Sequence, residues 1–343
     1  MISAICKELE LRKDYLKDQS IETIYFGGGS PSILKISDIE KILVAIDSFY
    51  RIKAKEITLE ANPDDLSTEK LNGWKSVGID RLSLGIQSFQ QDRLSFYNRA
   101  HTAKESLVAI DNARNAGFEK FNLDLIYGYP DANHDLWIAD LKKALELDPG
   151  HLSCYALTIE RDTALGRWSQ KGKFHEADEE FVAEEFEILQ DLTASKGYTQ
   201  YEVSNFAREG KISVHNSNYW KHIPYLGVGP SAFSFDGSDR GSNIRNNSKY
   251  IKALESGEAP YEPTNLSKED KINEYLLTSL RTIWGVDLDF LNSRLNFSII
   301  EYKRDALQKL QEEGLLLWNE KNVTLTKKGM LLADSVASTL FID

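Results

Sequence analysis

The sequence predicts an α/β protein, a partial parallel βα barrel followed by a small helical, winged-helix-like C-terminal domain. Three observations support this fold class. Short apolar runs typical of strands recur along the first two thirds of the chain, each is followed by a longer helical pattern, and the last hundred or so residues change to helices and one hairpin. Strand, helix, strand at intervals of roughly thirty residues is typical of parallel βα units.

Six apolar runs are predicted to be strands because they are short and bounded by turn-forming residues. They are 23–26, 56–61, 81–86, 121–127, 151–159 and 200–205. Six units suit a partly open barrel better than a small doubly wound sheet. The chain opens with a helical pattern, in which Ile2, Ile5 and Leu9 share one face, before its first strand. We therefore expect that one βα unit lacks its strand.

Helical patterns fill the intervals between these strands. They are 36–49, 68–77, 103–116 and 135–147. Gly, Ser, Asn and Arg dominate residues 234–247, which predicts an irregular connection. Further helices are predicted at 267–282, 288–292 and 299–313, then a hairpin, LLLW-NEKN-VTLT, and a helix at 328–340. We divide the chain into a barrel domain, residues 1–235, and a C-terminal domain, residues 236–343.

Composition excludes several classes of function. The formal net charge of -12 argues against nucleic acid as the main partner, because a duplex-binding protein needs cations to neutralise phosphates. There is no apolar run of the roughly 18 residues that a membrane span needs, so we expect no stable membrane insertion. Two distant cysteines, Cys6 and Cys154, fit a reducing cytoplasm. Two thiols cannot supply the usual thiolate set of an iron–sulfur cluster.

The segment YFGGGSPS, residues 25–32, directly follows a predicted strand. Three consecutive glycines let a backbone run close to a ligand, and their free N–H groups can receive polar atoms. No GK[ST] follows as in a P-loop, and the glycines lack the GxGxxG spacing of a dinucleotide site. The segment therefore indicates either a ligand-binding loop or a tight turn between a strand and a helix.

Four other polar residues stand at or near predicted strand ends. They are Glu60, Gln87, Arg99 and Asp124. Each has a structural alternative, as a cap, a surface charge or a core residue bonded to backbone. Asp124 lies inside an apolar run, where a buried charge needs a partner or a ligand. Together with the glycine loop, these groups suit a zwitterion that carries a ribose.

The motifs GGGSPS, E-x-NP, SLGIQSF, NRAH and DLIYGYP resemble, in order and spacing, the radical-SAM coproporphyrinogen-III-oxidase-like family. The resemblance covers nearly the whole chain. It implies a radical-SAM type of barrel and S-adenosylmethionine as cofactor. It also implies that the amino acid end of this cofactor is held by Gly28, Gly29 and Ser30, and that the site is completed by Glu60, Gln87, Arg99, Asp124 and Ala156.

A second signature, HNSNYW, is similar to the HNxxYW motif of the haem-chaperone branch (HemW-like proteins). It contributes His215, Asn216, Tyr219 and Trp220 as the implied haem-binding residues. An imidazole can bind haem iron, and aromatic rings can pack on a porphyrin face. The alternative is a turn with a satisfied histidine and two core aromatics. The family usually has a second histidine where this chain has Phe233.

Members of this family carry CxxxCxxC shortly before the first helix of this chain, and those cysteines hold a [4Fe–4S] cluster. The sequence has no such motif. Either the coding start is placed at an internal methionine, or a truncated chain exists in its own right. We favour the first and expect the cluster in the full-length protein only. We assign no catalytic residue and no metal ligand, and we expect no radical chemistry from this chain.

The resemblance therefore predicts a haem chaperone that binds haem as cargo and delivers it to apo-haemoproteins. The alternative is an oxygen-independent coproporphyrinogen III oxidase, which oxidatively decarboxylates two propionates of a porphyrinogen in porphyrin biosynthesis. Whether the protein is an enzyme stays open at this point. A different class, a nucleic-acid-binding regulator that uses the hairpin as a wing, has only Lys327 and Lys328 in its favour.

Overall fold

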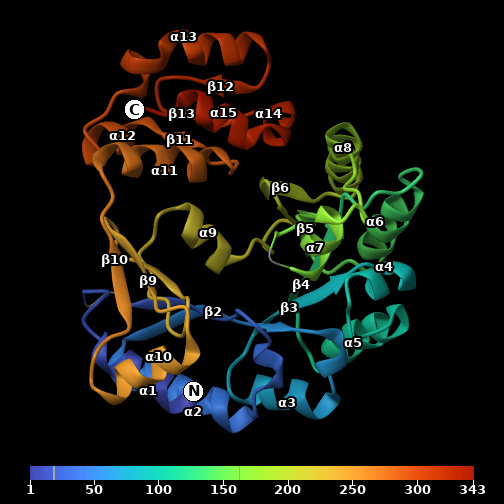
Figure 1. The fold of residues 1–343 in the computed structure, drawn as a ribbon, viewed down its shortest axis with the longest axis vertical. Coiled ribbons are helices and arrows are strands. Elements are labelled where there is room, and N and C mark those ends of the chain that lie inside the picture. Colours follow the sequence, from blue (N-terminus) through green and yellow to red (C-terminus); the bar gives the residue numbers. More distant parts are fainter. Residues whose placement is uncertain (18–19, 162) are drawn as a thin grey trace.

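The computed structural model describes residues 1–17, 20–161 and 163–343, and its central element is a curved seven-stranded sheet (Figure 1). The strands are β1 (Ile21–Phe26), β2 (Ile52–Ala61), β3 (Arg81–Gln87), β4 (Lys120–Tyr127), β5 (His151–Ala156), β6 (Thr199–Glu202) and β7 (Asn205–Ala207). Their order is β1-β2-β3-β4-β5-β7-β6, and β1 to β5 pair in parallel. The predicted α/β fold with a partial parallel barrel is confirmed.

The sixth predicted strand, 200–205, is wrong in kind. This segment is the hairpin β6–β7, in which β7 runs antiparallel to β5 and to β6. Glu202 closes the turn, because its carboxylate accepts hydrogen bonds from Ser204 N (3.0 Å) and Asn205 Nδ2 (2.7 Å). Apolar residues on both arms give the hairpin the pattern of one strand.

Helices cover the outer side of the sheet, and one short helix lies on its inner side (Figure 1). The helices of this region are α1 (Ile2–Leu11), α2 (Ile36–Phe49), α3 (Thr68–Ser76), α4 (Gln91–Phe96), α5 (Ala103–Asn115), α6 (Asp135–Leu147), α7 (Ala164–Gln170), α8 (Glu179–Ser195) and α9 (Val214–Trp220). Short 3₁₀ turns follow β1 and β2, at Pro31–Ile33 and Pro63–Asp65. Fully buried Ile39, Trp74 and Ile110 belong to the same core as Leu59 and Leu82 of the strands.

The predicted irregular connection at 234–247 is also wrong. A small antiparallel sheet, in the order β10-β9-β8, occupies most of it. Its strands are β8 (Phe233–Phe235), β9 (Arg240–Asn243) and β10 (Tyr261–Thr264), with α10 (Asn247–Glu255) between the last two. The segment looked irregular because Ser234 and Asn243 are polar, yet both are buried and bonded.

A buried ion pair joins α1 to this small sheet. Arg12 Nη1 donates to Glu8 Oε1 at 3.0 Å, and both side chains are almost fully buried. Glu8 also accepts from Tyr250 Oη (2.5 Å) and Asn243 Nδ2 (2.7 Å), while Arg12 donates to Ser234 Oγ (3.0 Å). Because every partner but the pair itself lies more than 200 residues away, this network fixes the two ends of the barrel region together.

The C-terminal region is a separate lobe of helices with a three-stranded sheet, in the order β11-β13-β12 (Figure 1). Its elements are α11 (Lys268–Leu280), β11 (Val286–Asp287), α12 (Leu288–Arg294), α13 (Ile299–Glu312), β12 (Leu316–Trp318), β13 (Asn322–Leu325), α14 (Lys327–Leu331) and α15 (Ala333–Leu340). The hairpin is where the sequence predicted it, whereas the last predicted helix is divided at Leu332. The domain boundary at 235/236 falls between β8 and β9 and stays a prediction.

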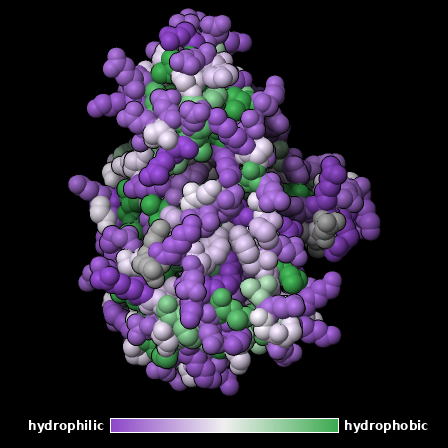
Figure 2. Space-filling view, turned by 90° about the vertical axis from the view of Figure 1, so that its left-hand side faces the viewer, coloured by the Kyte–Doolittle hydropathy of each residue, from purple (hydrophilic) through white to green (hydrophobic). Residues whose placement is uncertain are grey.

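The surface agrees with the polar composition. Figure 2 shows the C-terminal lobe standing on a wider body, with hydrophilic residues over most of that face and apolar residues in small patches. Among the described residues, no helix has the length and apolar character needed to cross a bilayer.

We expect Glu8→Ala to lower the free energy of unfolding by about 3–5 kcal/mol, because it leaves the Arg12 charge buried without its partner. Equilibrium urea unfolding measures this loss. Glu10→Ala on the same helix is the control, since Glu10 forms only an exposed pair with Lys7 and should leave the unfolding midpoint nearly unchanged. Equal losses in both variants would contradict a dominant role for the buried pair.

Candidate functional site

The inner face of the sheet is polar, in contrast to its outer face. Successive residues of a strand point to opposite faces, so alternate residues line the inner side. These inner residues include Thr58 and Glu60 of β2, Arg81 and Ser83 of β3, Asn122 and Asp124 of β4, and Ser153 and Tyr155 of β5. The register sets them in rows, with Thr58 beside Arg81, Glu60 beside Ser83, and Asp124 beside Ser153.

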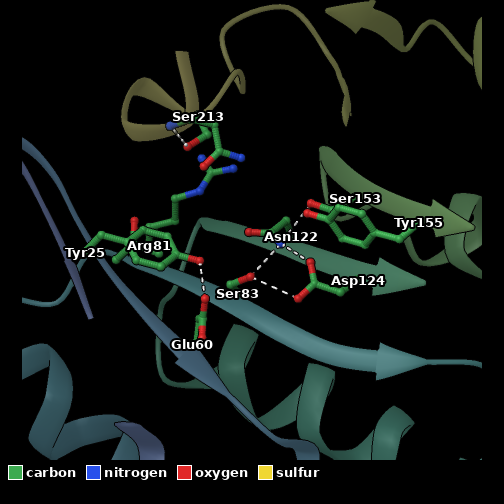
Figure 3. Close-up of a pocket in the computed structure, with 11 residues that line it drawn as sticks. Tyr25, Glu60, Arg81, Ser83, Asn122, Asp124, Ser153, Tyr155 and Ser213 are labelled. Atoms are coloured by element: carbon green, nitrogen blue, oxygen red, sulfur yellow. Dashed lines mark hydrogen bonds between the residues drawn. The ribbon is translucent and has the colours of Figure 1, made fainter. Parts of the chain in front are cut away.

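These side chains enclose a cavity of about 270 Å³ (Figure 3). Tyr25 of β1 lines it on one side, and Ser213 and Asn216 from the start of α9 line it at another. Hydroxyl, amide, carboxylate and guanidinium groups all face the interior. Such a lining suits a polar or charged ligand, because each buried polar group needs a partner.

Asp124 is the most perturbed carboxyl group of the cavity. Burial raises its pKa to about 7, and the charge of Glu60 acts in the same direction. Hydrogen bonds from Ser83 Oγ (3.1 Å) and Asn122 Nδ2 (2.7 Å) act against this rise (Figure 3). Asp124 therefore changes its protonation state near neutral pH, which is a common property of functional carboxyl groups.

The glycine loop begins where β1 ends, and Glu60 anchors it. Glu60 Oε1 accepts from the Tyr25 hydroxyl at 2.8 Å, and Oε2 accepts from Gly28 N at 3.1 Å. A Cβ at Gly27 would lie 2.8 Å from Glu60 Oε1. Gly28 and Gly29 have φ values of 77° and 87°, and a Cβ at either would meet nothing within 4 Å. The loop thus has the conformation that favours glycine and open space beside it.

Gln87 and Arg99 meet beside Gly85. A Cβ at Gly85 would lie 3.0 Å from both Gln87 Nε2 and Arg99 Nη2, so a glycine lets the two side chains approach. Gln87 has a φ of 67°, which is uncommon for a residue with a side chain and occurs where function requires a strained position. Arg99 Nη2 donates to Asn62 Oδ1 at 2.7 Å, and burial lowers the pKa of this guanidinium.

The predicted cofactor residues thus gather at the carboxyl edge of the parallel strands, as the fold class predicts. Glu60 and Asp124 line the cavity itself, whereas Gln87 and Arg99 stand outside its lining. Ser30 is exposed after the glycines, and Ala156 is the last residue of β5. Their assignment to S-adenosylmethionine stays a prediction.

The donor and acceptor set fits the ammonium, carboxylate and ribose of S-adenosylmethionine, because carboxylates, an amide and open backbone are all present. The same residues do not fit a [4Fe–4S] cluster. In the part of the chain that the structure describes, no group of three or more His, Cys, Asp or Glu side chains is placed to hold a metal ion. Cys154 is buried in β5, and Cys6 Sγ lies 3.9 Å from the carbonyl oxygen of Lys41.

His215 lies in the first turn of α9 and faces β1. Its Nδ1 is 2.9 Å from Thr23 Oγ1, and its ring stacks on Tyr25 with centroids 4.6 Å apart. Burial lowers the pKa of His215 to about 4, so its imidazole is neutral at pH 7. When Nδ1–H donates to Thr23, Nε2 keeps the lone pair that a metal ion needs.

The other residues of HNSNYW divide between two environments. Tyr219 packs edge-on against His215, with centroids 5.1 Å apart, and is 43% exposed. Asn216 lines the cavity. Trp220 instead lies beneath the Arg281 guanidinium of the C-terminal lobe, 5.9 Å from its ring centroid. Phe233 is exposed, and no histidine replaces it there.

Sequence reasoning missed the residues inside the strands. Thr58, Arg81, Asn122 and Ser153 were passed over because they do not stand at strand ends. A signal was present, since polar residues alternate with leucines in RLSL and in NLDL, residues 81–84 and 122–125. In a sheet whose outer face is covered by helices, that alternation indicates a polar inner face.

Comparisons with known proteins agree with these features. Residues 6–144 match the radical SAM superfamily, and residues 266–332 match the HemN C-terminal domain. The haem chaperone HemW of Bacillus subtilis is 34% identical over 319 residues, covering 92% of this chain and 84% of that protein. The mitochondrial radical S-adenosyl methionine domain-containing protein 1 of Bos taurus is 31% identical, with coverages of 93% and 75%. Coproporphyrinogen III oxidase (HemN) from Escherichia coli has a similar fold, with a TM-score of 0.81, 22% identity and coverages of 99% and 82%.

We expect the stability of the chain to report the titration of Asp124. Its folded-state pKa of about 7 exceeds that of an unfolded carboxyl group. Its contribution is therefore fully present below about pH 4 and is lost as pH rises through 7. Relative to Asp124→Asn, the wild type should lose about 3 kcal/mol of unfolding free energy between pH 5 and pH 8. Urea unfolding at several pH values measures this difference.

Asp111→Asn, on the exposed side of α5, is the control for this experiment and should follow the wild type at every pH. If the wild type and Asp124→Asn have parallel pH profiles, the raised pKa of Asp124 is wrong.

Proposed function

Because this chain belongs to the family of the haem chaperone HemW, within the radical SAM superfamily, we propose that it binds haem and delivers it to apo-haemoproteins. The observation that carries the proposal is the environment of His215 in HNSNYW. One ring nitrogen of this neutral imidazole is oriented by Thr23, and the other is left to a ligand. The likeness to the oxidase, at 22% identity, supports the fold alone.

His215 would bind the haem iron through Nε2. A hydrogen bond at the other ring nitrogen sets the orientation of a ligating imidazole and raises its basicity. Thr23 fills this role, and the ring of Tyr25 holds the imidazole from one side. Glu56 anchors the backbone, since its carboxylate accepts from His215 N at 3.0 Å. The ligand therefore stands on a rigid support, as haem transfer between specific partners requires.

Exposed aromatic rings beside His215 would carry the macrocycle. Tyr219 is partly exposed next to the imidazole and stacks at 4.4 Å on Tyr225. An exposed site suits a carrier better than an enclosed pocket, because the acceptor protein must reach the haem. Trp220 contributes to the position of α9 through Arg281 in this arrangement, and Asn216 faces the neighbouring cavity.

S-adenosylmethionine would lie at the carboxyl edge of the strands. Gly28, Gly29 and Ser30 would hold its amino acid end, and Glu60, Gln87, Arg99, Asp124 and Ala156 would complete the site. When bound to a reduced [4Fe–4S] cluster, this cofactor supplies a deoxyadenosyl radical. The residues of this chain do not fit that cluster, so we derive no radical step. We place haem delivery in the cytoplasm, because Cys6 and Cys154 are free thiols.

We expect the purified chain to bind ferric haem saturably, one to one, with a change in the Soret band. His215→Ala should weaken binding at least about tenfold, which corresponds to the loss of about 1.4 kcal/mol. His175→Ala is the control, because His175 is an exposed histidine outside this site. Unchanged haem affinity in the double variant His215→Ala, Tyr219→Ala would remove the site assignment.

We also expect no reductive cleavage of S-adenosylmethionine by the 343-residue chain, because two cysteines cannot supply three cluster thiolates. The measurement is 5′-deoxyadenosine released after iron–sulfur reconstitution and dithionite reduction. A parallel reaction with the same chain extended by a CxxxCxxC segment is the comparison. Deoxyadenosine formed by the unextended chain would show that this expectation is wrong.

A further inference from the structure

Two buried polar groups of the cavity have no hydrogen-bond partner. They are Arg81 Nη2 and Thr58 Oγ1. The Arg81 side chain is 4% exposed, and Thr58 is 1% exposed. A buried donor without a partner costs stability, and the cost is larger when the donor is charged. Both groups line the cavity and stand side by side, because Thr58 and Arg81 are register partners on β2 and β3.

The nearest carboxylate does not satisfy this arginine. Glu56 Oε2 is 3.4 Å from Arg81 Nη1, a long hydrogen bond, and leaves Nη2 free. Glu56 is also the acceptor for the start of α9, from Ser213 Oγ, Val214 N and His215 N at 3.0 to 3.1 Å. Its acceptor capacity is thus used on the helix. Figure 3 shows the guanidinium of Arg81 extending from its strand toward Ser213.

The free groups define the chemistry of the missing partner. A guanidinium N–H can only donate, and a threonine hydroxyl can donate beside it. The ligand group must therefore be an acceptor, and a carboxylate gives the strongest bond to a guanidinium. Glu60 does not compete for this place, since it accepts from Tyr25 and Gly28.

The same groups adjoin the proposed iron ligand. Tyr25 is the register partner of Thr58 and stacks on His215, and Glu56 bonds both Arg81 and the His215 backbone. At about 270 Å³, the cavity is smaller than the range of about 300–1,000 Å³ that encloses a drug-sized ligand. It therefore admits a side arm of a large ligand and leaves the macrocycle outside.

We propose that Arg81 and Thr58 form a carboxylate-binding site that takes a propionate of the haem held by His215. This inference rests on the proposed function. The propionate accepts from Arg81 Nη2 and Thr58 Oγ1, enters from the side of Tyr25 and stays clear of Glu60. The haem is then held at two points, its iron and its carboxylate, and its orientation on α9 is fixed.

The test compares ferric haem with its dimethyl ester, which keeps the iron and the macrocycle but has no free carboxylate. Each is titrated into the wild type, Thr58→Val and Arg81→Lys, and the Soret change gives the two affinities. Thr58→Val keeps the side-chain shape, and Arg81→Lys keeps a charge beside Glu56. Thr199→Val is the control, because Thr199 is an exposed threonine on β6.

We expect the wild type and Thr199→Val to prefer haem over the ester by at least about tenfold, in line with one charge-assisted hydrogen bond. Thr58→Val should reduce this preference, and Arg81→Lys should abolish it. Equal affinities for haem and ester in the wild type, with binding that still depends on His215, overturn the carboxylate site and leave the proposed function standing. Preference retained in Thr58→Val overturns the site even if Arg81→Lys does not fold. No saturable binding of either compound overturns both.

Discussion

The Glu56 carboxylate joins β2 and β3 to the first turn of α9, and the position of His215 follows from this contact. Within one side chain it accepts from a neighbouring arginine, from the Ser213 hydroxyl and from two backbone N–H groups of the helix. A seven-residue helix has little stability of its own, so tertiary bonds must fix it. Because the carboxylate is buried, these bonds are not weakened by competing water.

The division between an apolar outer face and a polar inner face explains how one sheet serves both folding and binding. Helices α2, α3 and α5 bury leucines and isoleucines against the outer face, and this burial supplies most of the stabilisation. The inner residues are free to be polar because the cavity, the glycine loop and α9 give them partners. Asp124 is the exception, since its surroundings favour the neutral carboxyl group up to about neutral pH.

Local sequence patterns were sufficient for the strands β1 to β5, for most helices and for the gathering of Gly28, Glu60 and Asp124 at one edge of the sheet. They failed where a residue's environment is set by distant parts of the chain. Ser234 and Asn243 look like loop residues until Arg12 and Glu8 are placed beside them. Glu185 belongs to a charged run typical of an exposed helix, yet it is buried and accepts from Gly128 N. Arg81 is similar, because its unpaired nitrogen is evident only in three dimensions.

The long sequence separation within the Glu8–Arg12 network has a consequence for biosynthesis. Glu8 is made early, but its partner Asn243 follows 235 residues later. At translation rates of about 5–20 residues per second, α1 waits roughly 10–50 s before those partners leave the ribosome. Both charges stay hydrated during this interval, and docking of α1 is a late step that closes the barrel region. Nascent chains should therefore remain vulnerable to proteases and to self-association until the small sheet has emerged.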